Sequence, residues 1–292
     1  MLVMWKLWQL KWHYRHGAHY YWARNLKSIL IMIVCNSYSH KNHPHNVFFA
    51  CVSFWQIFIL RDHIAGHYCV VYCDDILIFS NTDDPAEHLF KLTAVSETLR
   101  NHELLIKGSK TELFRSEVEF LGFQLSQGGW TPTESKVTAI VEWPAPETVK
   151  HLRSFLGMAD FFRSFIPVYS DMAAPLTELL KNTKGGSQNL EWSVSCQTAF
   201  MSLKAALTSA PVLRHFDPTL RTAVHIDGSQ NAVGAVQLQW QEGEDNPRPV
   251  AYMSRKLKGA QYRYDARNVE ALAAQMALQT WRTLLLGQKF EF

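Results

Sequence analysis

Apolar residues recur along the chain in two patterns, and each pattern predicts a different element. Short runs of β-branched and aromatic residues predict strands, whereas apolar residues three or four positions apart predict helices with one buried face. The predicted strands cover residues 70–72, 76–79, 104–106, 118–125, 222–227, 233–238, 249–254 and 289–292. The predicted helices begin near residues 85, 149, 175, 194 and 268. The chain is therefore expected to have an α/β (α+β) fold.

Capping residues mark the starts of three of these helices. Asp84 can cap the first helix, with Pro85 at its first position and Glu87 placed to complete a capping box. Thr148 and Ser193 can cap two later helices. The buried faces predicted by helical spacing are Leu89, Leu92, Val95 and Leu99 in the first helix, Leu152, Phe155, Leu156 and Ala159 in the second, and Ala199, Phe200, Leu203 and Leu207 in the third.

The first 60 residues differ from the rest of the chain. Met1–Arg61 contains no Asp or Glu, although soluble proteins mix charges of both signs. Its apolar runs, Ile29–Cys35 and Val47–Leu60, are shorter than the roughly 20 residues that a membrane-spanning helix needs. We expect residues 1–60 to be a poorly ordered segment unrelated to the rest, such as a translated intron or a shifted reading frame. A short membrane-associating leader is the alternative.

Length and composition set broad limits on the protein class. With 292 residues the chain is long enough for two or three domains, and its net charge of +3 is a weak indication of a nucleic-acid partner. Five cysteines without paired short spacings argue against a disulfide framework, so an intracellular protein of the cytoplasm or nucleus is expected. His63, His67, Cys69 and Cys73 resemble metal ligands, but no second cluster completes a zinc pattern.

Two adjacent carboxylates lie between the first two predicted strands. Asp74 and Asp75 follow the run Val70–Tyr72 and precede the run Ile76–Phe79, which places them at the turn of a hairpin. Asp is common in turns, so the pair alone is explained by an ordinary hairpin. However, adjacent like charges are costly unless a positive group lies against them. The pair is therefore also a candidate cation site.

Ordered strings from residue 60 onward resemble a gypsy-type LTR-retrotransposon polyprotein. In family order they are Tyr72–Ser80, Phe120–Phe123, Leu152–Gly157, Phe161–Ile166, Ala210–Leu213, Asp227–Ser229 and Pro249–Leu257. Together these strings are specific, although each alone would be weak. The resemblance implies a reverse transcriptase palm remnant at 61–132, a helical thumb at 133–184, and a connection helix with a truncated RNase H-like mixed sheet and helix at 185–292. Residues 1–60 fall outside it.

For the polymerase, the resemblance implies that Asp74 and Asp75 are two of three catalytic carboxylates that hold two Mg²⁺ ions. The third carboxylate of the family lies on an earlier strand. Here that region falls within Met1–Arg61, which contains no acid. We therefore expect no polymerase activity from this chain.

For the ribonuclease H site, the resemblance implies that Asp227 and Glu270 are catalytic metal ligands for Mg²⁺. From the residues alone, Asp227 is explained as a turn residue at the end of a strand. Glu270 is explained as a surface acid in the first turn of a helix predicted at Asn268–Leu286, where the helix dipole favours an anion. Gly228 stands where the family usually has Ala, which adds flexibility. The family's next acid follows the fourth strand, within which this chain stops. We expect weak Mg²⁺ binding and little or no hydrolysis of RNA–DNA hybrids.

Nucleic-acid binding without catalysis is the main competing function. Lys150, Arg153 and Arg163 are candidates for phosphate contacts by resemblance, and the first two share one helical face. A solvated basic face is the alternative. The expected class is thus a fragment of RNA-directed DNA polymerase with ribonuclease H, whose partner is an RNA–DNA hybrid or a primed RNA template. A co-opted nucleic-acid-binding protein and a gene-model fragment without a stable product stay open, no membrane partner is expected, and the oligomeric state is not predicted.

Overall fold

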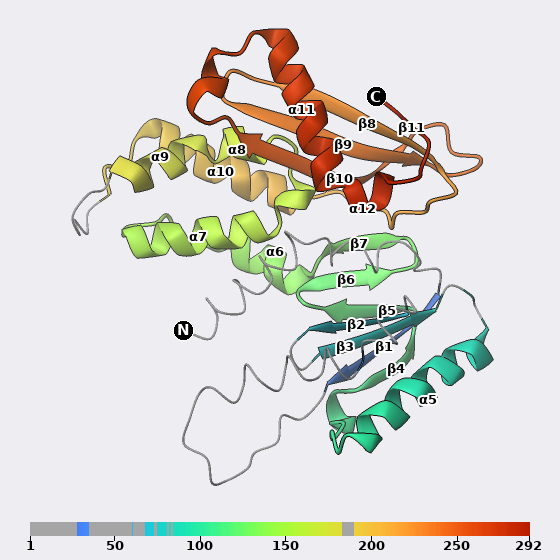
Figure 1. Ribbon diagram of the computed structural model, residues 1–292. Coiled ribbons are helices and arrows are strands. Elements are labelled where there is room, and N and C mark those ends of the chain that lie inside the picture. Colours follow the sequence, from blue (N-terminus) through green and yellow to red (C-terminus); the bar gives the residue numbers. More distant parts are fainter. Residues whose placement is uncertain are drawn as a thin grey trace. The chain divides into compact units, whose positions relative to one another are not determined.

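The computed structural model describes residues 28–34, 60, 68–72, 75–80, 82, 84–182 and 190–292, the first of these segments by its backbone (Figure 1). The described part divides into two compact units, one ending at Trp130 and the other beginning at Thr131. Within these residues, no helix is both long enough and apolar enough to cross a lipid bilayer.

A four-stranded sheet with the order β2-β3-β1-β4 forms the centre of the first unit. The strands are β1 (Ser28–Val34), β2 (Cys69–Tyr72), β3 (Asp75–Ser80) and β4 (Glu112–Arg115). β2 and β3 pair antiparallel with Tyr72 opposite Asp75, which confirms the predicted hairpin. All residues of β3 after Asp75 are buried, and the strand has a partner on each side within the sheet.

β1 lies in a segment for which the composition predicted poor order. It pairs antiparallel with β3 on one side and with β4 on the other. Its sequence, Ser-Ile-Leu-Ile-Met-Ile-Val, contains several β-branched residues, which suit a strand. For residues 1–27 and 35–59 the expectation of poor order falls outside the described part of the chain.

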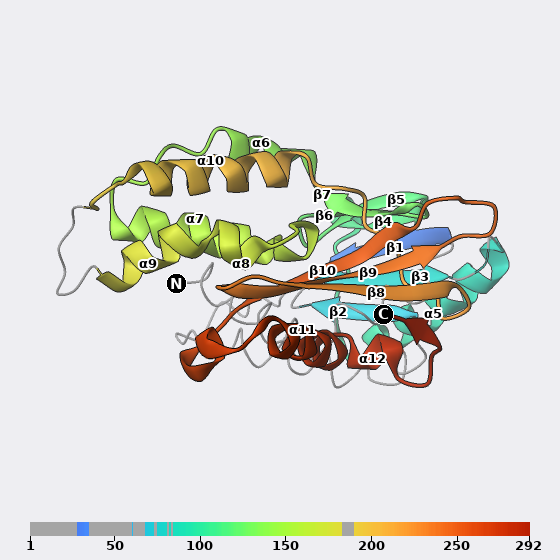
Figure 2. The ribbon, with the colours of Figure 1, turned by 90° about the horizontal axis from the view of Figure 1, so that it is seen from above.

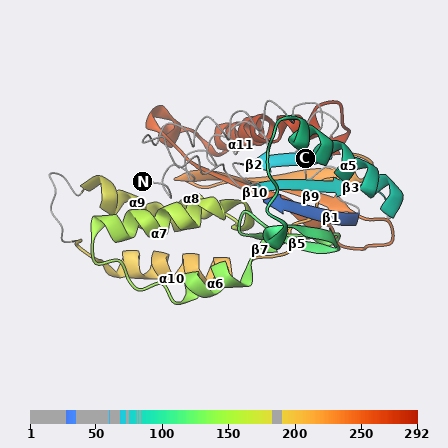
Figure 3. The ribbon, with the colours of Figure 1, turned by 90° about the horizontal axis from the view of Figure 1, so that it is seen from below.

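Helix α5 (Pro85–Asn101) lies against this sheet (Figure 3). Asp84 is its N-cap and accepts a hydrogen bond from the Ala86 N–H at 2.9 Å, as predicted. The Glu87 carboxylate, expected to close a capping box, instead accepts from the Thr82 hydroxyl and pairs with Lys91. The predicted buried face was partly wrong: His88 is fully buried, whereas Leu89 is 51% exposed.

The run at 118–125 forms two strands rather than the single strand predicted. β5 (Glu117–Phe120), β6 (Phe123–Ser126) and β7 (Gly129–Pro132) make a three-stranded sheet. Leu121 and Gly122 both have positive φ, 54° and 85°, and form the two-residue turn that matches hairpin twist. Residues 104–106 do not form the predicted strand: Leu105 is 58% exposed, and a short 3₁₀ helix, η2 (Gly108–Lys110), follows.

The second unit begins with a group of helices that lie side by side (Figure 2). These are α6 (Glu134–Val141), α7 (Val149–Phe161), the 3₁₀ helix η3 (Arg163–Phe165), α8 (Tyr169–Met172), α9 (Ala174–Asn182) and α10 (Val194–Thr208). Thr148 and Ser193 cap α7 and α10, and both predicted buried faces are confirmed. α6 was not predicted, because Ile140 is its single buried residue and gives too weak a periodic signal.

A second four-stranded sheet, with the order β10-β9-β8-β11, follows the helices. Its strands are β8 (Arg221–Gly228), β9 (Ala232–Trp240), β10 (Arg248–Lys256) and β11 (Phe290–Glu291). The first three pair antiparallel, and β11 pairs parallel with β8, which makes the sheet mixed. The four strands predicted in this region are therefore confirmed.

Helices cover both faces of this sheet (Figure 2). After the 3₁₀ helix η4 (Gly259–Arg263), α11 (Ala266–Thr280) and α12 (Arg282–Leu285) replace the single helix predicted at 268–286. α11 contacts β8 and β9 on one face, whereas α8 contacts β9 and β10. Gly228 faces Val269 of α11 and Gly234 faces Val168, which precedes α8. Since Gly234 follows the residue paired with Gly228, strand alternation places the two helices on opposite faces.

Candidate functional site

The acidic hairpin has one of its two carboxylates in the described part of the chain. Asp75 is the first residue of β3 and is partly buried, whereas Asp74 lies outside the described residues. Val34, the last residue of β1, pairs with Asp75. None of the seven residues of β1 is acidic, so β1 brings no second carboxylate to Asp75.

The four His and Cys residues that resemble metal ligands lie almost entirely outside the described residues. His63, His67 and Cys73 are not described, and Cys69 is a buried residue of β2. Among the residues that the structure does describe, no group of three or more His, Cys, Asp or Glu side chains could hold a metal ion.

The RNase H-like carboxylates lie on neighbouring elements. Asp227 is exposed near the end of β8, and its Oδ1 accepts a hydrogen bond from the Gly228 N–H at 2.8 Å. Glu270 is exposed on α11. The prediction that Glu270 lies in the first helical turn was wrong, because Asp265 caps the helix and accepts from the Asn268 N–H at 2.8 Å. Glu270 is thus in the second turn, where the dipole effect is weaker.

Gly228 has a spatial role rather than the flexibility that the sequence suggested. A Cβ at this position would lie 2.3 Å from Cγ1 of Val269, far inside van der Waals contact. The missing side chain therefore allows α11 to approach β8 closely. This contact joins the residue after Asp227 to the residue before Glu270, so it fixes the two acidic segments relative to each other.

Asp227 and Glu270 are both exposed and lie on elements that contact each other, β8 and α11. Mg²⁺ prefers oxygen ligands, keeps several waters, and is commonly held by one or two carboxylates together with substrate phosphates. Asp227 and Glu270 supply oxygen ligands of this kind, and one oxygen of Asp227 is already fixed by the Gly228 N–H.

The three basic residues predicted to contact phosphate have different surroundings. Arg163 donates to the Asp160 carboxylate and to the main-chain carbonyl of Ser254, and its guanidinium lies 5.5 Å from the Tyr169 ring centroid. Arg163 therefore joins η3 to β10 through a partly buried side chain. Lys150 and Arg153 are exposed on α7, and neither makes an ion pair with another described residue.

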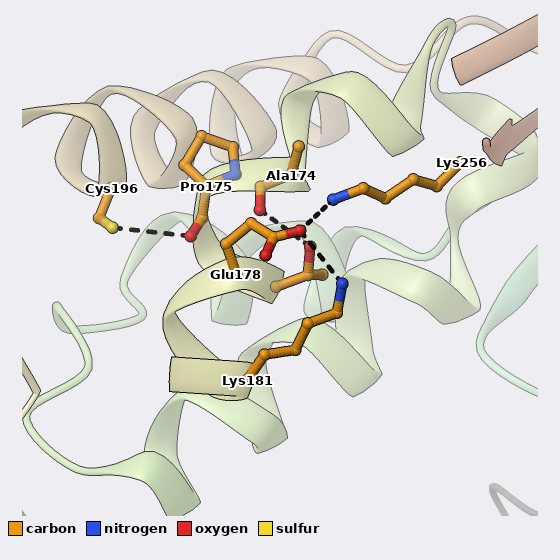
Figure 4. A network of polar contacts seen from close by, with 7 residues as sticks. Ala174, Pro175, Glu178, Lys181, Cys196 and Lys256 are labelled. Carbon is orange, nitrogen blue, oxygen red and sulfur yellow. Dashed lines mark hydrogen bonds and ion pairs between the residues drawn. The ribbon is translucent and has the colours of Figure 1, made fainter. Parts of the chain in front are cut away.

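A polar network that the sequence did not reveal ties α9 to the same strand (Figure 4). Glu178 pairs with Lys256 of β10 and with Lys181 at 3.1 Å. These hydrogen bonds, that of Lys256 first, lower the pKa of the Glu178 carboxyl below its usual value. Cys196 Sγ lies 3.8 Å from the Pro175 carbonyl oxygen in the same region. Glu178 and Lys256 are 78 residues apart, so no local pattern could have linked them.

Comparisons with known families match both parts of the chain. The family model described as reverse transcriptase (RNA-dependent DNA polymerase) matches residues 31–125, and that for the RNase H-like domain found in reverse transcriptase matches residues 192–292. The first match begins about 30 residues before the boundary that composition predicted near residue 60.

Curated relatives and solved structures agree with these matches. The Transposon Tf2-3 polyprotein of Schizosaccharomyces pombe is 37% identical over 216 residues, which are 74% of this chain and 16% of that protein. The Transposon Tf2-7 polyprotein of the same organism is 34% identical over 244 residues, 83% of this chain and 18% of the relative. The chain thus spans less than a fifth of the length of these relatives.

The fold is similar to that of foamy viral protease-reverse transcriptase. The structure in complex with double-stranded DNA gives a TM-score of 0.74 at 23% identity and covers 92% of this chain and 50% of that one. The structure in complex with RNA/DNA hybrid gives 0.73 at 23% identity and covers 92% and 39%. The chain thus matches the reverse transcriptase and RNase H-like family models over two separate stretches and is homologous to part of the Tf2 polyproteins, which belong to gypsy-type LTR retrotransposons.

Proposed function

We propose that this chain binds nucleic-acid duplexes, RNA–DNA hybrids above all, without extending primers. The observation that carries this proposal is the pairing of Val34 with Asp75. Two-metal polymerisation needs carboxylates from more than one strand around the ions. Asp74 and Asp75 are the proposed metal ligands of the hairpin, and neither β1 nor the rest of Met1–Arg61 offers a third acid.

Asp227 and Glu270 are the proposed ligands of Mg²⁺ in the RNase H-like part. Reverse transcriptase and RNase H families generally use this ion, which in such sites activates a water nucleophile and stabilises the leaving oxygen. In this chain the two carboxylates would bind the cation and hold it close to a bound phosphate. With two protein carboxylates, cation affinity depends on the nucleic acid itself, so we expect little or no hydrolysis of the RNA strand.

The α7 surface is the proposed contact for the duplex backbone. Lys150 and Arg153 are three residues apart, exposed and on one face of the helix, and their charges are not used by ion pairs within the described residues. Arg163 is left out of this surface because its guanidinium already bonds Asp160 and Ser254. Support for a duplex ligand comes from the foamy viral neighbours, whose structures contain double-stranded DNA and RNA/DNA hybrid.

The test is the salt dependence of hybrid binding, measured by fluorescence anisotropy with a labelled RNA–DNA hybrid. Replacing Lys150 and Arg153 by Gln should lower the slope of log affinity against log salt by about 2, because each phosphate contact contributes about 0.9. Arg221→Gln with Arg248→Gln is the matched control, since these exposed cations already pair with Glu291 and Glu244. An unchanged slope in the first variant, or an equal fall in the control, would contradict the proposed surface.

Residual ribonuclease activity is a separate question with its own assay. Single-turnover cleavage of a labelled hybrid in Mg²⁺ should give little or no product. Cleavage that is present in the purified chain and disappears in Asp227→Asn would instead assign a working RNase H site to it.

A further inference from the structure

The turn that follows Asp227 is organised by one serine hydroxyl. Ser229 Oγ accepts hydrogen bonds from the main-chain N–H groups of Asn231, at 3.2 Å, and Ala232, at 2.9 Å. The Ser229 N–H donates in turn to the Ala232 carbonyl at 2.8 Å. This hydroxyl therefore closes the turn between β8 and β9.

The proton of that hydroxyl is directed to a residue from the helical part of the unit. Asp171 Oδ2, on α8, lies 2.9 Å from Ser229 Oγ, while the other possible acceptor, the Ala232 carbonyl, is 3.1 Å away. A hydroxyl has one donor and two acceptor positions, and a carboxylate is the stronger acceptor. With two N–H groups accepted and one proton donated to Asp171, the hydrogen-bonding capacity of Ser229 is filled.

Asp171 is also a constrained group. Its second oxygen, Oδ1, is buried and has no hydrogen-bond partner among the described residues. Among the described residues, the hydrogen bond from Ser229 is the side-chain interaction that holds the Asp171 carboxylate against the turn. The two residues are 58 positions apart, so this is a tertiary contact rather than a local turn motif.

The same turn holds Asp227. Its Oδ1 accepts from the Gly228 N–H, and Gly228 immediately precedes Ser229. In the ladder Asp227 is paired with Gly234, whose missing side chain faces Val168 next to α8. The Asp227 carboxylate is therefore held by the backbone of the β8–β9 turn, and Asp171 of α8 holds that turn in place.

We propose that Asp171 is a positioning residue for Asp227, acting through the Ser229 hydroxyl and the β8–β9 turn. The inference rests on the proposed role of Asp227 as a divalent-cation ligand. Groups that orient metal ligands in this indirect way typically change metal affinity about 10- to 100-fold when removed. The helical segment would thus set the affinity of the RNase H-like carboxylates without touching the cation.

The experiment measures Mn²⁺ binding by water-proton relaxation, using the purified full chain with a saturating RNA–DNA hybrid and subtracting the signal of the hybrid alone. Asp171→Leu and Ser229→Ala, which each remove the hydrogen bond, should weaken binding at least about 10-fold, whereas Asp171→Asn keeps an acceptor and should bind within about 3-fold of the original chain. Melting temperature is recorded for every variant, and Glu178→Gln serves as a control in the same helical region. Ser229→Ala tests the contact if Asp171→Leu does not fold.

The outcomes separate this inference from the proposed metal site. Asp227→Asn must abolish Mn²⁺ binding; if it does not, the metal site itself is refuted. If Asp227→Asn abolishes binding but Asp171→Leu and Ser229→Ala bind like the original chain, the positioning role is refuted and the site stands. If Asp171→Asn loses as much affinity as Asp171→Leu, the charge of Asp171 is what matters, and the indirect role is likewise overturned.

Discussion

Acid should weaken the first unit through one buried histidine. His88 of α5 is fully buried, its Nδ1 lies 2.7 Å from Ser80 Oγ at the end of β3, and its Nε2 is buried without a hydrogen-bond partner among the described residues. Burial, followed by the nearby Lys91, lowers the pKa of His88 from 6.5 to about 4, and Glu87 opposes this shift. Burial in the contact between α5 and the strand of Asp75 therefore favours the neutral imidazole.

The expected magnitude follows from this difference in pKa. The unfolded chain takes up a proton near pH 6.5 and the folded chain near pH 4, so stability is complete above 6.5 and falls as the pH drops toward 4. A difference of about 2.5 units corresponds to at most about 3 kcal/mol. Glu87, whose pKa is lowered by Lys91 and Thr82, loses its contribution at lower pH, below its usual value of 4.5.

Hydrogen exchange followed by mass spectrometry can measure this effect in the first unit alone. After correction for intrinsic exchange rates, the opening free energy of α5 amides should fall by about 2–3 kcal/mol between pH 7 and pH 4. His88→Gln should remove most of this dependence, whereas His102→Gln, an exposed histidine after the same helix, should keep it. Equal pH dependence in His88→Gln and the original chain would refute the reasoning.

Three further predictions concern the second unit. Gly228→Ala should lower the free energy of unfolding by about 1–3 kcal/mol in urea titrations, because its Cβ would overlap Val269; an unchanged midpoint would mean that α11 moves freely. Arg163→Met should destabilise the unit by about 1–3 kcal/mol yet leave the salt slope of hybrid binding unchanged, and a reduced slope would restore Arg163 as a phosphate contact. A double-mutant cycle on Glu178 and Lys256 should give a coupling below about 1 kcal/mol, since both side chains are partly exposed; a coupling above about 2 kcal/mol would contradict a solvent-screened pair.

Local signals in the sequence predicted the elements that depend on local physics. Thr148 caps α7 as expected, because a threonine just before an amphipathic run can accept a hydrogen bond from the first turn of the helix and so marks where the helix starts. The sequence did not predict the turn at Leu121 and Gly122, because neither turn residue is polar. A leucine with positive φ is also uncommon, so this position gave no turn signal. The start of α11 was placed two residues late, because its apolar face begins after the true cap, Asp265.

Contacts between distant residues could not be predicted in this way. The sequence predicted Arg163 to be a surface cation, because its hydrogen-bond acceptor, the Ser254 carbonyl, lies 91 residues later in the chain. The same holds for Asp171 and Ser229, whose types are ordinary for a helix and a turn. The candidate ligands Asp227 and Glu270 came from the family resemblance, and the tertiary structure adds the close approach of their elements at Gly228.

The most direct test of the account is primer extension by the purified chain on a primed RNA template with Mg²⁺ and deoxynucleoside triphosphates. We expect salt-sensitive binding of the primed template and no extension, because β1 supplies no carboxylate opposite Asp75. Metal-dependent extension that is present in this chain and lost in Asp75→Asn would contradict the central claim.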